Sequence, residues 1–191
     1  MNVKRYAGYA ALAAIATGAI VTVFLFSAGR NDAPDRAARN IAISKPEPRP
    51  ANTSLVHLYF GDRDNPYLIS EERIVRHSDD PTDFSRSIVK ALISGPTQGL
   101  VRTLPQDTTL RAVYLTEQGI CYVDLSAAVQ ENHPGGVDTE RLTIYSIVNS
   151  LILNIAEIRA VKILIEGQET MTLAGHIDLQ NPAKANMLLI R

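Results

Sequence analysis

The chain has 191 residues, a length that suits one domain with additional segments. Its 19 lysine and arginine residues nearly balance its 20 aspartate and glutamate residues, so the net charge is −1. This balance, and the lack of a basic block in the sequence, argue against nucleic acid as a partner. The single cysteine, Cys121, excludes an intrachain disulfide and a cluster of several thiolate metal ligands within one chain.

The N terminus carries an uncharged apolar run over residues 6–28. Its length of about 23 residues exceeds the roughly 20 that a helix needs to cross the hydrocarbon core of a membrane. Lys4 and Arg5 precede the run and favour an N terminus in the cytoplasm. We therefore predict a single-pass transmembrane anchor over residues 1–29 in the cytoplasmic membrane. The rest of the chain would face the extracytoplasmic side, in the periplasm or at the cell exterior.

A cleaved signal peptide is the alternative for this segment. Its apolar region would normally be about 7–15 residues long and would end at small residues, for which Ser27, Ala28 and Gly29 are a weak match. No cysteine follows the run directly, so a lipid-modified N terminus has no residue to act through.

Three segments follow the predicted anchor. Residues 30–53 are charged and rich in proline, which indicates an extended extracytoplasmic linker that cannot fold alone. Residues 54–181 carry the apolar periodicity of a folded domain, and residues 182–191 form a C-terminal tail with no predicted structure.

The domain opens with two extended segments and a helix. Residues 55–61 and 67–76 are predicted strands. Residues 81–94 place apolar side chains three or four positions apart, as one face of a helix requires. We predict that Gly95 is the left-handed residue that ends this helix, since Pro96 cannot continue it.

A hairpin and a second helix come next. Residues 109–116 and 119–126 read as two antiparallel strands joined by a turn. Residues 127–138 are predicted to be a loop, with a short turn of helix left open. A longer helix is predicted from Thr139 to about Ile155, with Asp138 as its N-cap.

The last elements are a near-continuous apolar strand over residues 161–167 and a short extended segment over residues 169–173. The order of elements predicts an α+β fold in which two helices pack on one face of a mixed or antiparallel sheet of three to five strands.

The sequence gives little support for a catalytic function. Ser126, His133 and Asp138 lie in or beside one loop, but the serine lacks the sharp G-x-S-x-G turn of a nucleophile. Gly135 and Gly136 precede a helix without either of the phosphate-binding glycine motifs. We therefore predict no catalytic residue, no cofactor and no metal site.

Several motifs together resemble the GerMN domain of bacterial sporulation and spore germination proteins. They are the GPT…LP turn that begins at Gly95, the VDLS strand end, the SIVNSL helix and the VKILIEG strand, and the resemblance covers roughly residues 55–180. It implies a cell-envelope protein with an extracytoplasmic α+β domain, similar in fold to ring-building motif domains. The resemblance supplies no catalytic residues. The positions that match its pattern are Gly95, Pro96, Thr97, Leu104, Pro105 and Gly167.

Three functions remain open at this point. The first is a non-enzymatic scaffold or interaction protein that binds its own kind or another envelope protein through sheet edges and through loops 96–107 and 131–138. The second is a module that binds peptidoglycan or another carbohydrate through tyrosines. The third is an envelope hydrolase that uses Ser126 or His133. The candidate interaction residues are Gly95, Pro96, Thr97, Leu104, Pro105, His133, Gly135 and Gly136, and the candidate stacking tyrosines are Tyr59, Tyr67, Tyr114 and Tyr122.

Overall fold

The computed structural model describes residues 52–191 of the chain. The predicted anchor and nearly all of the predicted linker lie outside the described residues. Within the described part, no helix combines the length and the apolar character that crossing a membrane would require.

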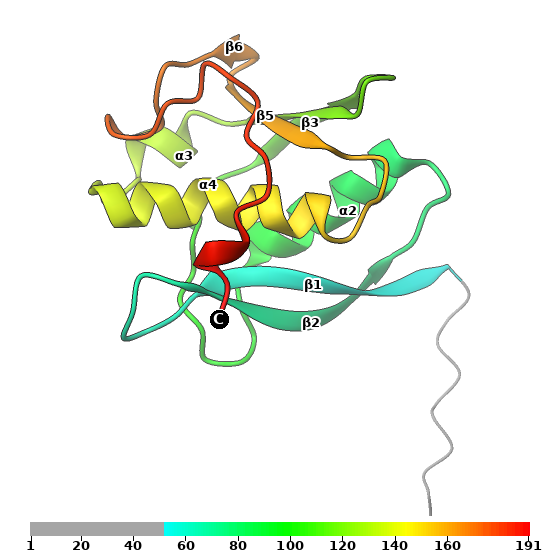
Figure 1. Cartoon of the computed structure of the whole chain (residues 1–191), viewed down its shortest axis with the longest axis horizontal. Helices are drawn as coiled ribbons and strands as arrows, with labels where there is room; N and C mark the ends of the chain where they lie inside the picture. Colours follow the sequence, from blue (N-terminus) through cyan, green and yellow to red (C-terminus); the bar gives the residue numbers. More distant parts are fainter. Residues whose placement is uncertain (1–51) are drawn as a thin grey trace, which may run out of the picture. The chain divides into compact units, whose positions relative to one another are not determined.

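The first two strands form a sheet of their own (Figure 1). β1 (Thr53–Gly61) and β2 (Leu68–Arg76) pair antiparallel, from Thr53 opposite Arg76 to Gly61 opposite Leu68, without a register shift. Side chains alternate between the faces of a strand, and every second residue of β1 is accordingly buried on the face toward the helices. These residues are Val56, Leu58 and Phe60.

Helix α2 (Pro81–Ser94) begins at Asp80, whose carboxylate accepts hydrogen bonds from the N–H groups of Thr82 and Asp83. The helix ends at Gly95, as predicted, and the N–H of this glycine donates to the carbonyl of Leu92. Its φ of 88° is positive, but its ψ of 175° is extended rather than left-handed helical, which corrects the predicted geometry. A side chain at Gly95 would clash with the guanidinium of Arg102.

The second sheet has the strand order β3-β4-β5-β6. β3 (Leu110–Leu115) and β4 (Ile120–Leu125) form the predicted antiparallel hairpin. β5 (Ala160–Ile165) pairs parallel to β4, and β6 (Gln168–Glu169) pairs antiparallel to β5. A parallel neighbour needs a long crossover connection, and the segment between β4 and β5 supplies it with two helices.

Those two helices are α3 (Ala128–Glu131), a single turn within the predicted loop, and α4 (Val137–Ile152). The N-cap of α4 is Gly136 and not the predicted Asp138, which lies in the first turn and pairs with Arg141 at 2.6 Å. Gly136 has a φ of 90°, a conformation that favours glycine, so the chain turns into the helix two residues earlier than predicted.

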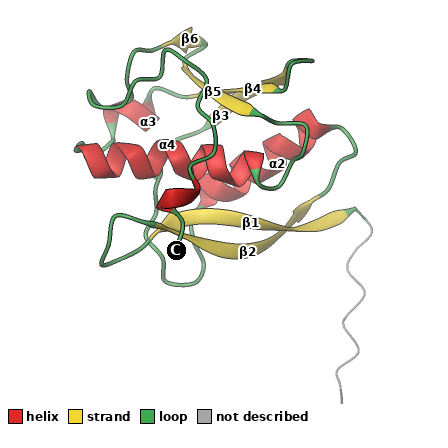
Figure 2. Ribbon diagram, viewed as in Figure 1, coloured by secondary structure: helices red, strands yellow, loops and turns green. Residues whose placement is uncertain are grey.

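The α+β class is confirmed, but the prediction of one sheet with both helices on one face is wrong. The helices lie between two sheets (Figure 2). The free edge of β1 does not join the larger sheet because side chains of α4 and of the segment after it occupy this edge. The N–H of Tyr59 donates to Ser150 Oγ at 3.0 Å, and the N–H of His57 donates to Asn154 Oδ1 at 2.9 Å.

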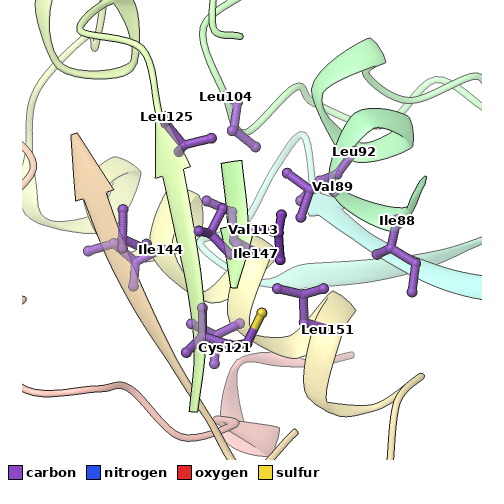
Figure 3. Close-up of a cluster of buried hydrophobic side chains, with 14 of the residues drawn as sticks. Ile88, Val89, Leu92, Leu104, Val113, Cys121, Leu125, Ile144, Ile147 and Leu151 are labelled. Atoms are coloured by element: carbon purple, nitrogen blue, oxygen red, sulfur yellow. The ribbon is translucent and has the colours of Figure 1, made fainter. Parts of the chain in front are cut away.

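The main core fills the space where α2 and α4 meet both sheets. Figure 3 shows side chains from α2, α4, β3 and β4 gathered in one cluster, to which Leu104 is added from a loop. Burying these side chains drives folding, because each removes a large apolar area from water. The fully buried members include Leu58, Phe60, Ile88, Val89, Leu125, Ile147, Val148 and Leu151.

The C-terminal residues pack against both sheets. Ala183 forms a β-bridge with Val161, and the N–H of Arg191 donates to the carbonyl of Leu68 at 3.0 Å. Between these points a 3₁₀ turn, Met187–Leu189, buries Leu189 against Tyr59. The predicted short extended segment over residues 169–173 is β-paired only at Glu169.

Replacement of Leu151 by alanine tests the role of α4 as the layer between the sheets. Leu151→Ala removes a fully buried side chain and is expected to lower the free energy of unfolding by about 2–5 kcal/mol. Leu153→Ala, two residues away at a position that is 38% exposed, is the matched control and should cost much less. Urea denaturation of residues 48–191 measures both, and equal losses would contradict this packing.

Candidate functional site

Loop 96–107 begins at a buried carboxylate. The side chain of Glu71 on β2 is fully buried and accepts hydrogen bonds from the N–H and hydroxyl of Thr97, both at 2.9 Å, and from the N–H of Gln98 at 3.0 Å. Arg73 pairs with the same carboxylate at 2.5 Å and donates to the carbonyl of Gly95 at 3.0 Å. The GPT turn is thus held to the first sheet by two residues that the sequence analysis did not single out.

These contacts determine the charge of Glu71. Burial by itself would raise its pKa, but hydrogen bonds from Arg73, Thr97 and Gln98 outweigh burial and bring the pKa below the ordinary glutamate value of 4.5. Glu71 is therefore ionised at neutral pH, and its negative charge is paired and hydrogen-bonded rather than isolated in the core.

The far part of the same loop is attached to α4. Thr143 donates its hydroxyl to the carbonyl of Thr103 at 2.6 Å, and the hydroxyl groups of Thr103 and Ser146 are 2.6 Å apart. Leu104 is buried in the main core. Loop 96–107 is therefore fixed at both ends, by β2 at its start and by α4 near its end.

His133 joins loop 131–138 to the same threonine. Its Nε2 lies 3.0 Å from Thr143 Oγ1, and its Nδ1 accepts a hydrogen bond from the N–H of Gly135 at 3.0 Å. Because Nδ1 accepts, Nε2 carries the proton in the neutral ring and donates it to Thr143. Burial lowers the pKa of His133 below 6.5, although the charge of Glu140 opposes this effect, so the ring is neutral at pH 7.

The two predicted interaction loops thus meet through Thr143. A second link joins Asn132 to the carboxylate of Asp107 at 3.5 Å. We call the exposed residues around this junction the two-loop surface. It consists of Gln106, Asp107, Asn132, Pro134, Val137 and Asp138, all exposed to solvent.

Gly95, Pro96 and Thr97 do not belong to this junction. They lie at the Glu71 end of loop 96–107, whereas Thr103 and Leu104 lie at the Thr143 end. The other residues predicted from sequence lie at the junction. Leu104 packs in the core beneath it, and the turn of loop 131–138 contains His133, Gly135 and Gly136. Pro105 lies next to the exposed Gln106.

Glu140 is a second buried carboxylate that clamps a loop. It accepts hydrogen bonds from the N–H groups of Leu173, Ala174 and His176 at 2.8–2.9 Å, and its Oε2 lies 3.0 Å from His176 Nδ1. Burial raises its pKa, but these hydrogen bonds outweigh burial, so the pKa lies below 4.5. No local sequence pattern indicates this role for Glu140.

A third carboxylate explains the VDLS and IEG motifs. Asp124 is buried at the end of β4 and accepts hydrogen bonds from the N–H of Gly167 at 2.7 Å and from Arg111 at 3.2 Å. Arg111 also pairs with Glu166, which accepts a hydrogen bond from the N–H of Ala127 at 2.9 Å. The motif residues of two neighbouring strands therefore fix each other.

The residues of the hydrolase hypothesis have structural partners. Ser126 Oγ accepts a hydrogen bond from the N–H of Thr109 at 2.9 Å, and both ring nitrogens of His133 are engaged as described above. Among residues 52–191, no group of three or more histidine, cysteine, aspartate or glutamate side chains is placed to hold a metal ion.

A cavity of about 270 Å³ lies elsewhere, between the start of α2 and the segment after α4. His77, Phe84 and Asn154 are among the residues that line it, and none of its lining residues belongs to the predicted interaction loops.

Glutamine in place of Glu71 tests the clamp on the GPT turn. Glu71→Gln removes a buried charge and leaves Arg73 and the loop N–H groups with weaker partners, so we expect a loss of about 2–4 kcal/mol in the free energy of unfolding. Glu72→Gln alters the next residue, which is exposed on the opposite face of β2, and should change stability by less than about 0.5 kcal/mol. Urea denaturation measures the free energy of unfolding of both variants. Similar small losses in the two variants would show that Glu71 does not hold the GPT turn.

Stability should fall as the solution is acidified, in two stages. The depressed pKa of His133 means that the unfolded chain takes up a proton first, so stability declines as pH falls through about 6.5. The depressed pKa values of Glu71 and Glu140 add a second decline as pH falls below about 4.5. The melting temperature measured across pH 3–8 should show both declines. In His133→Gln, only the decline near pH 6.5 should become smaller. A profile that is unchanged in that variant would argue against a buried neutral His133.

Comparison with known proteins agrees with this fold. The model of the Germane family, described as sporulation and spore germination, matches residues 57–170. No curated protein matches the chain. The first GerMN domain of the Bacillus subtilis sporulation protein GerM is 18% identical, with a TM-score of 0.55 over 70% of this chain and 98% of that domain.

Two further solved structures are similar. The tandem GerMN domains of the same Bacillus subtilis protein give a TM-score of 0.54 at 19% identity, and this chain spans 46% of their length. A candidate lipoprotein from Clostridium perfringens is 25% identical, with a TM-score of 0.50 over 70% of this chain and 88% of that one. The family match extends from β1 to β6 and takes in α2 and α4, which confirms the GerMN resemblance. The chain therefore belongs to the Germane family, whose description is sporulation and spore germination.

Proposed function

We propose that this chain is a non-enzymatic interaction or scaffold protein of the cell envelope. In this proposal residues 1–29 anchor the chain in the cytoplasmic membrane, residues 30–53 are a spacer, residues 54–181 form the interaction domain and residues 182–191 are its tail. The apolar run over residues 6–28 supports an anchor. Similarity to a candidate lipoprotein supports a membrane-attached, extracytoplasmic domain.

The observation that carries this proposal is the way in which the two loops are held. Loop 96–107 is fixed at its start by Glu71 and near its end by Thr143, and the middle of loop 131–138 is fixed by Thr143 as well. Loops that are ordered before binding lose less conformational entropy when a partner docks. The two-loop surface is thus a preorganised patch, and its partner would be another envelope protein or a second copy of the chain.

The same contacts favour binding over catalysis. A general acid or base must have a proton or a lone pair available to a substrate. Glu71, Glu140 and Asp124 direct their oxygens at backbone N–H groups, and His133 directs both nitrogens at neighbouring groups. The process served would be sporulation or germination, as the family description suggests, or the assembly of cell-wall or division complexes.

Changes on the two-loop surface should abolish partner capture without unfolding the domain. The triple variant Asp107→Arg, Asn132→Arg, Val137→Glu alters exposed side chains only. In-cell crosslinking of the full chain, followed by mass spectrometry, should show at least a tenfold loss of captured envelope proteins, the effect of about 1.4 kcal/mol of lost binding energy.

The matched control is Glu117→Arg with Gln118→Arg, at exposed positions in the β3–β4 turn. It should retain the captured proteins. If the triple variant is folded and captures the same proteins as the parent chain, the two-loop surface is not the binding site.

A carbohydrate-binding function is the second candidate, and one observation favours it. Tyr114 is 60% exposed and stands directly opposite Tyr122 on the outer face of the larger sheet, where aromatic rings suit the stacking of sugars. Tyr59 is buried, and Tyr67 lies under the guanidinium of Arg191 at 4.2 Å.

Co-sedimentation with purified peptidoglycan sacculi tests this candidate. Binding that is lost in Tyr114→Ala and kept in Tyr67→Ala would support it, because only the first variant removes the exposed ring of the pair. If the parent chain sediments with sacculi no more than an unrelated protein does, the carbohydrate-binding function is excluded.

A further inference from the structure

The outer edge of β2 carries backbone groups with no partner among the described residues. Hydrogen-bonded pairs alternate with non-bonded pairs along an antiparallel ladder. The bonds from His77 N–H to Asn52 and from Asp62 N–H to Tyr67 fix this alternation. It follows that the N–H and C=O groups of Ser70, Glu72, Ile74 and Arg76 point away from β1.

Other edges of the described sheets are covered in part, irregular or short. On β1, the outward N–H groups of His57 and Tyr59 are bound by Asn154 and Ser150, and Gly61 exchanges two hydrogen bonds with Val101. In the larger sheet, β3 is interrupted by a bulge and β6 has two residues. Proteins protect their strand edges by such means, yet β2 from Ser70 to Arg76 has no bulge and no proline.

The side chains on this edge would favour an added strand. Ile74 is 55% exposed and stands directly opposite Leu55 of β1, which is 39% exposed. Glu72 and Arg76 lie on the same face of β2 as Ile74, one on each side of it, and both are exposed. The edge thus presents an acidic, an apolar and a basic residue in a row.

There is space on both faces for the side chains of an incoming strand. A hollow of about 440 Å³ is lined by Ile74, Arg76 and His77 among others. A second, also of about 440 Å³, is lined by Val75 and Arg76 of β2 and by Ser87 and Lys90 of α2. A strand pairing with β2 would place alternate side chains near these two hollows.

We propose that β2 pairs antiparallel with β2 of a second copy of this chain, across a two-fold axis at Ile74. Only residues with outward backbone groups can be hydrogen-bonded partners, which restricts the possible registers. With Ile74 opposite the partner subunit's Ile74, Glu72 faces the partner subunit's Arg76, and the same ion pair recurs on the other side of the axis.

Neighbouring registers are less complementary. An axis at Glu72 would place that carboxylate opposite the partner subunit's Glu72, and like charges in direct opposition destabilise a sheet. An axis at Arg73 would place Glu72 opposite the partner subunit's Ile74 and leave both charges without an opposite partner. The row of acidic, apolar and basic side chains therefore selects one self-pairing register and makes a second copy the fitting occupant.

This inference rests on the proposed scaffold function and specifies how copies associate. Pairing at Ile74 joins two hairpins into one four-stranded sheet, held by about six backbone hydrogen bonds from three bonded pairs. It uses β2 and leaves the two-loop surface exposed for a further partner.

Disulfide formation by the full chain in its membrane tests the register. In Ile74→Cys, the two Cα atoms would lie about 5.5 Å apart, which is within the range for a disulfide. We expect an oxidant-dependent covalent dimer. Cys121 is buried, so the parent chain should give none, and Glu117→Cys in the β3–β4 turn is the exposed control that should also give none.

Charge reversal supplies the decisive comparison. Glu72→Arg or Arg76→Glu in the Ile74→Cys background should each reduce dimer yield by about tenfold, because two repulsive pairs replace two attractive ones. The two reversals together should restore the yield, since the pairs are then attractive again. The double variant Glu72→Cys, Arg76→Cys should also form the dimer, which covers the case in which a cysteine at position 74 impairs folding.

Absence of both dimers in folded protein, or a yield that does not respond to the charge reversals, would overturn self-pairing at β2. If capture of other envelope proteins through the two-loop surface persists in that case, the scaffold function stands and only this inference falls. If β2 dimers form but the triple variant of the two-loop surface captures its partners as the parent chain does, self-pairing at β2 stands and the two-loop surface is not the binding site.

Discussion

Three buried carboxylates hold the loops of this domain by accepting hydrogen bonds from backbone N–H groups. Glu71 binds the GPT turn, Glu140 binds residues 173–176, and Asp124 binds the turn after β5. A loop cannot satisfy its backbone through a helical or sheet ladder, and a buried N–H without an acceptor costs a substantial part of the stability of a domain. An ionised carboxylate accepts several such bonds at once, which suits turns that contain glycine and proline.

These carboxylates are engaged by loop N–H groups and, at Glu71 and Asp124, also by arginine side chains, so their contacts are structural. The domain gains ordered loops without disulfides or a second layer of secondary structure over them. Loops that are ordered before binding lose less conformational entropy when a partner docks, and the two loops that meet at Thr143 are the surface that the proposed function uses. The three carboxylates thus position the loops of the domain.

Helix α4 connects this surface to the sheets. One face of the helix packs in the main core, and Thr143 and Ser146 on the helix contact loop 96–107. Ser150 on the helix and Asn154, two residues after its end, occupy the edge of β1. Since α4 and the segment after it cover the β1 edge of the small sheet, the uncovered edge of this sheet is that of β2. The location of a sheet edge available for pairing thus follows from the polar residues on a helix.

The sequence by itself determined the local elements. Short runs of apolar and β-branched residues marked β1, β4 and β5, and a three- to four-residue period of apolar side chains marked α2 and α4. Glycine and proline marked the end of α2 and the loop before α4. The same residues carried the resemblance to the GerMN domain, which the family match confirmed.

Tertiary structure decided what those elements build. Residue composition predicts that β1 and β2 are strands but not which sheet they join, and the contacts of Ser150 and Asn154 with β1 separate them from the larger sheet. Glu71, Glu140 and Thr143 read as ordinary polar residues, because their partners lie 26–40 positions away and no local pattern records such pairings. The sequence determines where the chain turns and which faces are apolar, whereas long-range hydrogen bonds, which exist only after the layers pack, decide how the loops and edges are arranged.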